Sequence, residues 1–337
     1  MSNRRYTNEK DIPLALAVFL ATDNYDYDPG TVSATRLMKP ARQVILASRV
    51  PDEKNLIDID QLIQSRLGTA IHDGIEAAWK EPGNFQRAMS LLGYGKSVFN
   101  KIVINPEPEK LNPNQIPVYL EQRHYRTITV GGKEFKVSGK MDFVAGGAVQ
   151  DYKSTIAYTY KHSTKTDDFC KQGSIYRWLA PHIITADYIH IHYIFMDWAK
   201  YKVGTEKNYP PKRMHSVKVP LMSLEETDAY IRQQLSNVMA QEKLPEKEIT
   251  FCTKEQLWQD DPVYKYYKNP KNAGVKGKRS TKNFDNPVDA QTQLEKDKSV
   301  GTVLAVPGQI KACLYCAGFP VCTQKDQYIK DGLLTIE

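Results

Sequence analysis

Two carboxylates and an ammonium group lie close together in the segment GKMDFVAGGAVQDYKS, residues 139–154. Asp142 ends one apolar, extended run, and Asp151 and Lys153 stand two residues apart on the next run. Alternate residues of a strand share a face, so Asp151 and Lys153 point the same way. A glycine turn at 146–147 then brings Asp142 opposite them. The spacing therefore gathers three charged groups in a small volume.

This combination of groups suits the hydrolysis of phosphodiester bonds. Carboxylate oxygens hold Mg²⁺ or Mn²⁺, and such a metal polarises a phosphate and lowers the pKa of a bound water. A lysine can orient that water or stabilise developing charge. A D-x-K string alone is more often a solvated strand pair, so the neighbouring motifs decide between the two readings.

A histidine upstream adds a further metal-binding side chain. Apolar residues recur at helical spacing from Asp60 to Lys80, which predicts an amphipathic helix with His72 midway. A single histidine in such a place is usually an ordinary polar residue. Beside two carboxylates its imidazole would favour Mn²⁺ over Mg²⁺ somewhat.

Taken together and in order, these motifs resemble the RecB-type branch of the PD-(D/E)XK nuclease superfamily. The resemblance spans roughly residues 33–196, about half of the chain. The matching motifs are Gly68-Thr69-Ala70-Ile71-His72, Gly139-Lys140-Met141-Asp142, Asp151-Tyr152-Lys153-Ser154 and Gln172-Gly173-Ser174-Ile175-Tyr176.

The resemblance implies a role for each matched residue. It makes His72, Asp142 and Asp151 metal ligands and Lys153 the catalytic lysine. It also implies contacts from Gln172 and Tyr176 to the substrate or to the backbone of the active site. Glu121 fits the position of an earlier catalytic acid, although a solvated strand glutamate paired with a nearby arginine explains it equally well.

The pattern predicts an α/β fold, with a mixed central β-sheet flanked by helices as in restriction endonucleases. Strands over 118–130, 134–144 and 148–153 form an antiparallel meander, and further strands are expected over 186–198 and 214–221. Helices are expected to end near Gly93, over 169–179, and from a Ser223/Glu226 capping box to about 240. The expected divisions are a lead-in over 1–32, a nuclease core over 33–245, and an irregular, basic, cysteine-containing extension over 246–337.

The extension carries three closely spaced cysteines, Cys313, Cys316 and Cys322. Relatives in the resembled branch use such a trio with one upstream cysteine to hold a 4Fe–4S cluster. Here the segment 33–42, where that cysteine is expected, has none. A fourth ligand from Cys252 or Cys170 would give a Zn²⁺ site or a cluster, and three reduced thiols are the alternative.

A basic run between Tyr264 and Lys282 precedes these cysteines and contains Lys278 and Arg279 but no acid. Lysines can neutralise phosphates while tyrosine rings stack on unpaired bases, which predicts contact with single-stranded DNA or DNA ends. A solvated, flexible loop is the alternative, because glycines and a proline interrupt the run.

Composition sets wider limits on function. The 337 residues carry a net charge of +7, which favours a polyanionic partner only weakly. The longest uncharged run near the start, 12–22, is too short to cross a bilayer, and the odd number of cysteines suits a reducing compartment. We expect no membrane association and a cytoplasmic location, in the host cytoplasm if the gene belongs to a phage.

The expected activity is divalent-metal-dependent cleavage of DNA from its ends, in recombination, repair or phage DNA processing. No G-x-x-x-x-G-K-S/T loop occurs, so a helicase activity would belong to a partner protein, and a single-strand annealing protein is a second expected partner. Two alternatives stay open: a DNA-binding or recombination accessory protein with weak catalysis, and a nuclease of the same fold that acts on RNA.

Overall fold

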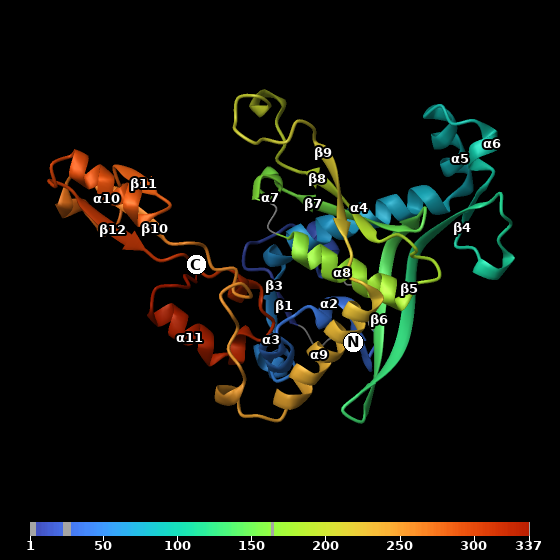
Figure 1. Ribbon diagram of the computed structural model, residues 1–337, viewed down its shortest axis with the longest axis horizontal. Coiled ribbons are helices and arrows are strands. Elements are labelled where there is room, and N and C mark those ends of the chain that lie inside the picture. The colour runs from blue at the N-terminus through green and yellow to red at the C-terminus, as the bar shows by residue number, and fades with distance from the viewer. Residues whose placement is uncertain (1–4, 23–27, 163–164, 337) are drawn as a thin grey trace. The chain divides into compact units, whose positions relative to one another are not determined.

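The computed structural model describes residues 5–22, 28–162 and 165–336, and the chain divides into two compact units (Figure 1). Unit 1 contains residues 1–39 and 55–237, and unit 2 contains residues 40–54 and 238–337. The sequence predicted a boundary near 245 and assigned 40–54 to the core. These fifteen residues instead pack with the C-terminal segment, as described below.

Unit 1 is an α/β structure around a mixed seven-stranded sheet. Its strands follow the order β4-β5-β6-β7-β8-β9, with β2 paired to β6 outside this path. The strands are β2 (Thr31–Ser33), β4 (Ile102–Ile104), β5 (Ile116–Val130), β6 (Lys133–Ala145), β7 (Ala148–Thr155), β8 (Tyr188–Phe195) and β9 (Met214–Pro220).

The expected meander is confirmed. Strands β5, β6 and β7 are antiparallel neighbours, joined by tight turns at Gly131-Gly132 and Gly146-Gly147, where all four glycines have positive φ. Strand β8 then pairs parallel to β7, and β9 runs antiparallel to β8. The parallel step requires a crossover, which the chain makes through α8 (Thr166–Leu179).

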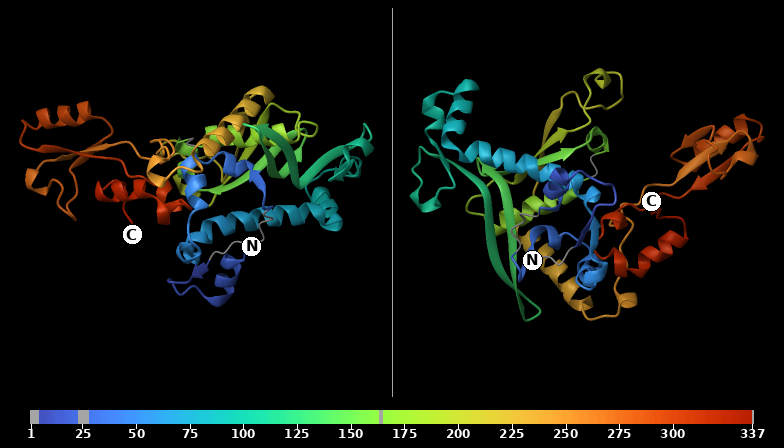
Figure 2. Two further views of the ribbon diagram at one scale, coloured as in Figure 1. Left: turned by 90° about the horizontal axis from the view of Figure 1, so that it is seen from below. Right: turned by 180° about the vertical axis from the view of Figure 1, so that it is seen from behind.

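Helices cover both faces of the sheet at β7 and β8. Helix α4 (Ile63–Lys80) runs lengthwise beside the sheet (Figure 2), and a Cβ built on its Gly68 would lie 3.4 Å from the Ser154 hydroxyl. On the other face, Phe169 of α8 meets Tyr193 with ring centroids 6.2 Å apart. The register pairs Tyr193 with Lys153, so these two side chains share a face of the sheet. Ser154 follows Lys153 directly and therefore points to the opposite face.

The remaining helices of unit 1 are short, apart from α9. They are α1 (Leu14–Ala21), α2 (Ala34–Leu37), α5 (Pro82–Leu91), α6 (Lys96–Phe99), α7 (Ala157–His162) and α9 (Leu224–Gln241). The predicted capping box of α9 is confirmed, because Glu226 N–H donates to Ser223 Oγ at 3.0 Å and Ser223 N–H donates to the Glu226 carboxylate at 2.8 Å.

The expected lead-in contains regular secondary structure in its described residues. Of the expected lead-in, residues 1–4 and 23–27 lie outside the described residues. The rest contributes α1, strand β2, and strand β1 (Arg5–Thr7), which pairs parallel with β3 (Leu56–Asp58). Within the described ranges, no helix is long and apolar enough to span a membrane.

Unit 2 combines helix α3 (Ala41–Ala47) with the C-terminal segment. Ile45 and Leu46 of α3 pack against Ile249 in a buried cluster, and Arg42 donates hydrogen bonds to the carbonyls of Glu246 (3.1 Å) and Ile249 (2.8 Å). This shared core explains why the segment 40–54 belongs to unit 2.

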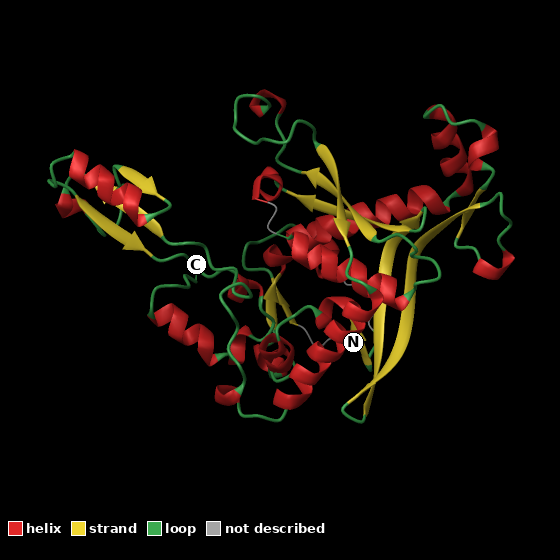
Figure 3. Cartoon of the chain, viewed as in Figure 1, coloured by secondary structure: helices red, strands yellow, loops and turns green. Residues whose placement is uncertain are grey.

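Part of the C-terminal segment forms a small sheet, so the expectation of an irregular extension is wrong there. Strands β10 (Val263–Tyr267), β11 (Lys282–Phe284) and β12 (Thr302–Val306) form a three-stranded antiparallel sheet beside α10 (Pro287–Lys296) (Figure 3). Helix α11 (Thr323–Lys330) follows the cysteines. Most of the strand contacts join residues 15 to 45 apart in sequence, which local patterns do not reveal.

Candidate active site

Three acidic residues occupy one row across β5, β6 and β7. The β6–β7 ladder ends at Phe143 paired with Gln150, so Asp142 and Asp151 form the next, unpaired position in register. In the β5–β6 ladder, the pairs on either side of Asp142 leave Glu121 as the residue opposite it. The row therefore runs Glu121, Asp142, Asp151 across three neighbouring strands, where β6 and β7 diverge.

His72 approaches this row from α4. Its Nδ1 lies 3.0 Å from Asp142 Oδ2, and its Nε2 lies 2.9 Å from the carbonyl oxygen of Tyr152. Both neighbours can only accept hydrogen bonds, so a proton on each ring nitrogen satisfies the geometry. The hydrogen bond with Asp142 accordingly raises the pKa of His72 above its ordinary value, against the opposing effect of burial.

Asp151 is buried, with an exposed fraction of 2%, and Lys153 is its counter-ion. The Lys153 ammonium donates to Asp151 Oδ1 at 3.0 Å and lies 2.7 Å from Oδ2. The Oδ2 contact lacks hydrogen-bonding geometry, so this buried oxygen has no hydrogen-bond partner among the described residues. Burial raises the pKa of Asp151, although the positive charge of Lys153 opposes the increase.

Glu121 adopts a backbone conformation that is unusual for its residue type. Its φ is +52°, in the left-handed region that costs a non-glycine residue about 1 kcal/mol or more. Burial raises the pKa of its carboxyl group, and its side chain lies 2.5 Å from Lys140 Nζ. Glu121 is therefore paired with a lysine, whereas the predicted alternative was an arginine.

The sequence analysis did not single out Lys140 or Glu76. Lys140 precedes Asp142 by two residues on β6, so the same period-two rule that grouped Asp151 with Lys153 could have found it. Glu76 lies one helical turn after His72 on α4, and its charge raises the pKa values of both Glu121 and Lys140. These residues extend the charged site beyond the four that the motifs predicted.

Helix α8 packs tightly against β6 just before Asp142. A Cβ at Gly139 would lie 2.7 Å from a Leu179 methyl carbon and 3.0 Å from the Tyr176 ring, so only glycine fits without displacement. Gln172 donates to the Tyr176 hydroxyl at 3.0 Å. The pair thus lies on α8 beside the strand that carries Asp142.

The predicted metal ligands are paired, His72 with Asp142 and Asp151 with Lys153. In the ranges described, no group of three or more His, Cys, Asp or Glu side chains is close enough to hold one metal ion. Yet a cation in place of the Nδ1 proton would satisfy His72 and Asp142, since cis ligands at ~2.1 Å from an ion lie about 3 Å apart. Asp151 Oδ2 accepts no hydrogen bond but lies beside the Lys153 ammonium, so the structure fits an ion at the His72–Asp142 pair.

The cysteines form a second cluster, in unit 2. Burial raises the pKa of Cys252 to about 11 and that of Cys313 to about 12, and neighbouring thiols, including Cys316 and Cys322, contribute to both shifts. Cys252 belongs to unit 2 with the predicted trio, whereas Cys170 lies on α8 of unit 1.

A glutamine holds Cys252 beside the C-terminal cysteines. The buried amide of Gln324 accepts from Cys252 N–H at 3.0 Å and donates to the Cys252 carbonyl at 3.1 Å. Arg42, in the segment 33–42 where the sequence resemblance implied an upstream cysteine, lies with Nε 3.5 Å from Cys322 Sγ. Sequence spacing could not indicate either contact, because both join residues far apart in the chain.

The basic run has less aromatic surface than predicted. Tyr266 and Tyr267 are buried in β10, and the Tyr266 hydroxyl donates to Asp297 at 2.5 Å, so these two rings are not available for stacking on bases. Lys278 and Arg279 are exposed on the loop before β11. Both belong to unit 2, whereas the acidic row belongs to unit 1.

Comparisons with known proteins do not assign the chain to a family. No family model and no curated protein sequence matches it. Among solved structures, the chain is similar to the crystal structure of SSO0001, with 18% sequence identity and a TM-score of 0.42 over 72% of this chain and 95% of that chain. A similarity of this degree carries no argument about function.

Proposed function

We propose that this chain is a divalent-metal-dependent DNA nuclease of the PD-(D/E)XK type. The observation that carries the proposal is the position of Asp142 and Asp151, side by side at the end of the β6–β7 ladder, with His72 on one and Lys153 on the other. The alternative of a solvated strand pair does not fit Asp151, because its exposed fraction is only 2%.

In this proposal each side chain has a separate task. Asp142, Asp151 and the Nδ1 atom of His72 hold the ion, and the hydrogen bond from Nε2–H to the Tyr152 carbonyl fixes the tautomer that leaves Nδ1 available. Lys153, about one-third exposed, stabilises negative charge on the reacting phosphate. Glu121, held by Lys140, supplies a second carboxylate next to Asp142.

The donor set favours Mg²⁺ or Mn²⁺. Carboxylate oxygens suit both ions, and an imidazole nitrogen shifts the preference towards Mn²⁺. When bound, such an ion polarises the phosphate and generates a nucleophile at neutral pH.

We further propose that the substrate is DNA and that cleavage begins at its ends, in recombination, repair or phage DNA processing. This part rests on the resemblance of the motifs to RecB-type nucleases. Two competing functions predict other results: an accessory DNA-binding protein would bind without cutting, and an RNA-directed enzyme of the same fold would prefer RNA.

The test is release of labelled nucleotides from linear single-stranded DNA, linear duplex DNA, a covalently closed circle and RNA, with Mg²⁺ or Mn²⁺. We expect metal-dependent release from linear DNA, a spared circle, and loss of activity in Lys153→Ala. Lys171→Ala is the matched control, because Lys171 is another lysine of unit 1 in a carboxylate pair, with Asp167.

Three outcomes would overturn parts of the proposal. Equal cutting by wild type and Lys153→Ala would remove Lys153 from the mechanism. Binding of DNA without cutting under any metal would favour the accessory protein, and preferential cutting of RNA would favour the RNA-directed enzyme.

We also propose that Cys252, Cys313, Cys316 and Cys322 together hold a Zn²⁺ ion or a 4Fe–4S cluster. The supporting observation is that Gln324 binds both backbone groups of Cys252 and so keeps it with the three C-terminal cysteines. Thiolate sulfur is the preferred donor for both groups. Metal and iron analysis of the purified protein distinguishes the two.

A further inference from the structure

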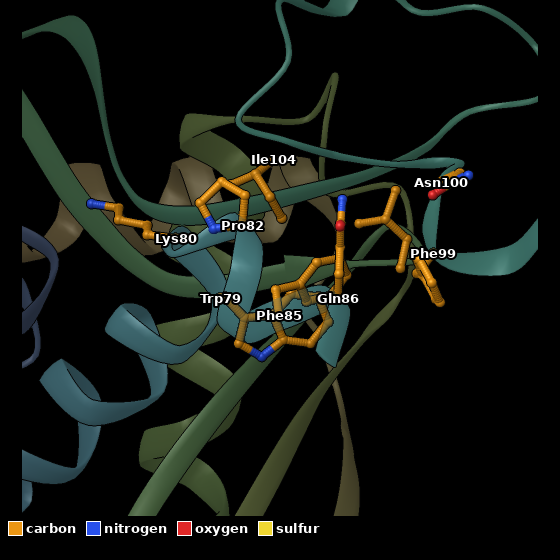
Figure 4. Close-up of a pocket in the computed structure, with 9 residues that line it drawn as sticks. Trp79, Lys80, Pro82, Phe85, Gln86, Phe99, Asn100 and Ile104 are labelled. Carbon is orange, nitrogen blue, oxygen red and sulfur yellow. The ribbon is translucent and has the colours of Figure 1, made fainter. Parts of the chain in front are cut away.

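A cavity of about 310 Å³ lies at the C-terminal end of α4, and neither the acidic row nor the cysteines account for it (Figure 4). Its volume is at the lower end of the range of about 300–1,000 Å³ for small-molecule sites, so it fits a small group. The lining residues are Trp79, Lys80, Pro82, Phe85, Gln86, Phe99, Asn100, Ile102 and Ile104.

The lining combines flat aromatic rings with polar side chains. Figure 4 shows the Trp79 and Phe85 rings at one part of the cavity and Phe99 with Asn100 at another. The Trp79 and Phe85 rings are 5.0 Å apart at 33°. Gln86 and Asn100 are exposed amides that can both donate and accept hydrogen bonds. Aromatic walls with amides at the rim match a nucleobase, which has a flat π-face and a hydrogen-bonding edge.

The surrounding segment carries the charge that a nucleic acid requires. From Pro82 to Pro106, which includes α5, α6 and β4, the chain has three basic residues and no acid. The three are Arg87, Lys96 and Lys101. Lysines and arginines near the cavity can neutralise the phosphates on either side of a bound base.

Aromatic contacts connect the cavity to the acidic row. Trp79 packs edge-on against Phe143 at 4.9 Å, and Phe143 meets Tyr152 at 6.3 Å. Phe143 follows Asp142 directly, and Tyr152 stands between Asp151 and Lys153. Along α4, Trp79 is seven residues beyond His72, about 10 Å at 1.5 Å per residue, which a stacked strand spans in on the order of three nucleotides.

We infer that this cavity binds one unpaired nucleobase of the DNA strand that is cut, a few nucleotides from the scissile phosphate. The inference rests on the proposed nuclease function and specifies its substrate, because a base that is paired and stacked in a duplex has no free face to place against the aromatic rings of the cavity. Stacking on Trp79 supplies most of the affinity, and the amides of Gln86 and Asn100 bind the edge of the base.

The test measures binding of a fluorescent single-stranded DNA 12-mer by anisotropy in EDTA, where cutting is blocked. We expect Trp79→Leu to weaken binding by about five- to tenfold, the scale of one lost base stack, and Trp79→Phe to keep most of the affinity. Gln86→Ala should weaken binding less. Asn84→Ala is the control, because Asn84 is exposed on the same helix but does not line the cavity. Circular dichroism and thermal melting verify that each variant is folded.

A series of 12-mers, each with one abasic position, makes the result specific to a base. Removing the base that enters the cavity should weaken wild-type binding as Trp79→Leu does, and should cause no further loss in Trp79→Leu. The inference is wrong if Trp79→Leu binds DNA as tightly as wild type. It is also wrong if every abasic position weakens binding by Trp79→Leu as much as it weakens binding by wild type. Cleavage of linear DNA would still support the nuclease in either case. If wild type neither binds nor cuts DNA, the proposed function fails first, and this inference fails with it.

Discussion

The acidic row of unit 1 and the cysteine cluster of unit 2 are held in place by different parts of the backbone. Glu121, Asp142 and Asp151 stand on three hydrogen-bonded strands whose register fixes their spacing. The cysteines lie in loops or at short 3₁₀ turns, and the backbone of Cys252 is held by the side chain of Gln324. The row can therefore keep its geometry without an ion, whereas we expect the proposed metal at the cysteines to contribute to the stability of unit 2.

The first prediction concerns catalysis and has the largest expected effect. Asp151→Asn keeps the size of the side chain but removes a charge that would bind the ion, so we expect cleavage to fall about a thousandfold, roughly 4 kcal/mol in barrier height. Asparagine avoids the cost of burying a carboxylate but loses the ion pair with Lys153, so we expect the free energy of unfolding to change by less than about 2 kcal/mol. Urea unfolding and initial cleavage rates test both parts. A stable variant with near wild-type rates would show that Asp151 has only a structural role.

The second prediction concerns the cysteine cluster. Cys316→Ser should release the bound zinc or iron and lower the free energy of unfolding of unit 2 by about 3 kcal/mol, because the ion stabilises only the folded state. Cys252→Ser should do the same, whereas Cys170→Ser on α8 should not. Metal analysis and limited proteolysis of residues 238–337 give the result. Unchanged metal content and stability in both variants would leave the cysteines as reduced thiols.

The third prediction concerns the packing that positions Asp142. In Gly139→Ala the new methyl group would meet Leu179 and Tyr176, so we expect a loss of about 1–3 kcal/mol in stability and slower cleavage. Gly83→Ala is the matched control. No atom lies within 4 Å of a Cβ at Gly83, and alanine is the better helix former. Equal stability of the two variants in urea would show that α8 can move aside at no cost.

The fourth prediction has the smallest effect and concerns pH without metal. Because the pKa of His72 is raised in the folded protein, its pairing with Asp142 stabilises the fold fully below the ordinary histidine value of 6.5. This stabilisation is lost as pH rises through the folded pKa. In EDTA, the stability advantage of wild type over His72→Gln should shrink as pH increases above about 6.5, by less than about 1 kcal/mol for this partly exposed pair. A difference independent of pH would contradict the pairing.

Much of the framework of unit 1 follows from local sequence patterns. Period-two runs with glycine turns gave strands β5, β6 and β7, and helical spacing gave α4. The register of β6 and β7 places Asp142 beside Asp151, and α4 brings His72 within 3.0 Å of Asp142. Local patterns could not give the left-handed backbone of Glu121 or its pairing with Lys140, because both depend on how β5 and β6 meet.

The features that the sequence did not predict depend on contacts between residues far apart in the chain. The parallel pairing of β2 with β6 and the inclusion of residues 40–54 in unit 2 join segments about one hundred or more residues apart. The segment around Tyr266 and Tyr267 has the composition of an exposed basic and aromatic loop. Both tyrosines are nevertheless buried, because β10 is the central strand of its sheet. Burial of this kind depends on strand pairing that composition does not encode.

The composition of unit 2 from two separate segments affects the order of folding during synthesis. Helix α3 is made early, but its partners Ile249 and Val321 are made some 200 to 275 residues later. Chains are synthesised at about 5–20 residues per second, so α3 lacks these partners for on the order of ten seconds or more. During this time Ile45 and Leu46 are exposed. We therefore expect nascent chains that stop before Val238 to bind chaperones or aggregate through α3, although they contain every residue of the acidic row.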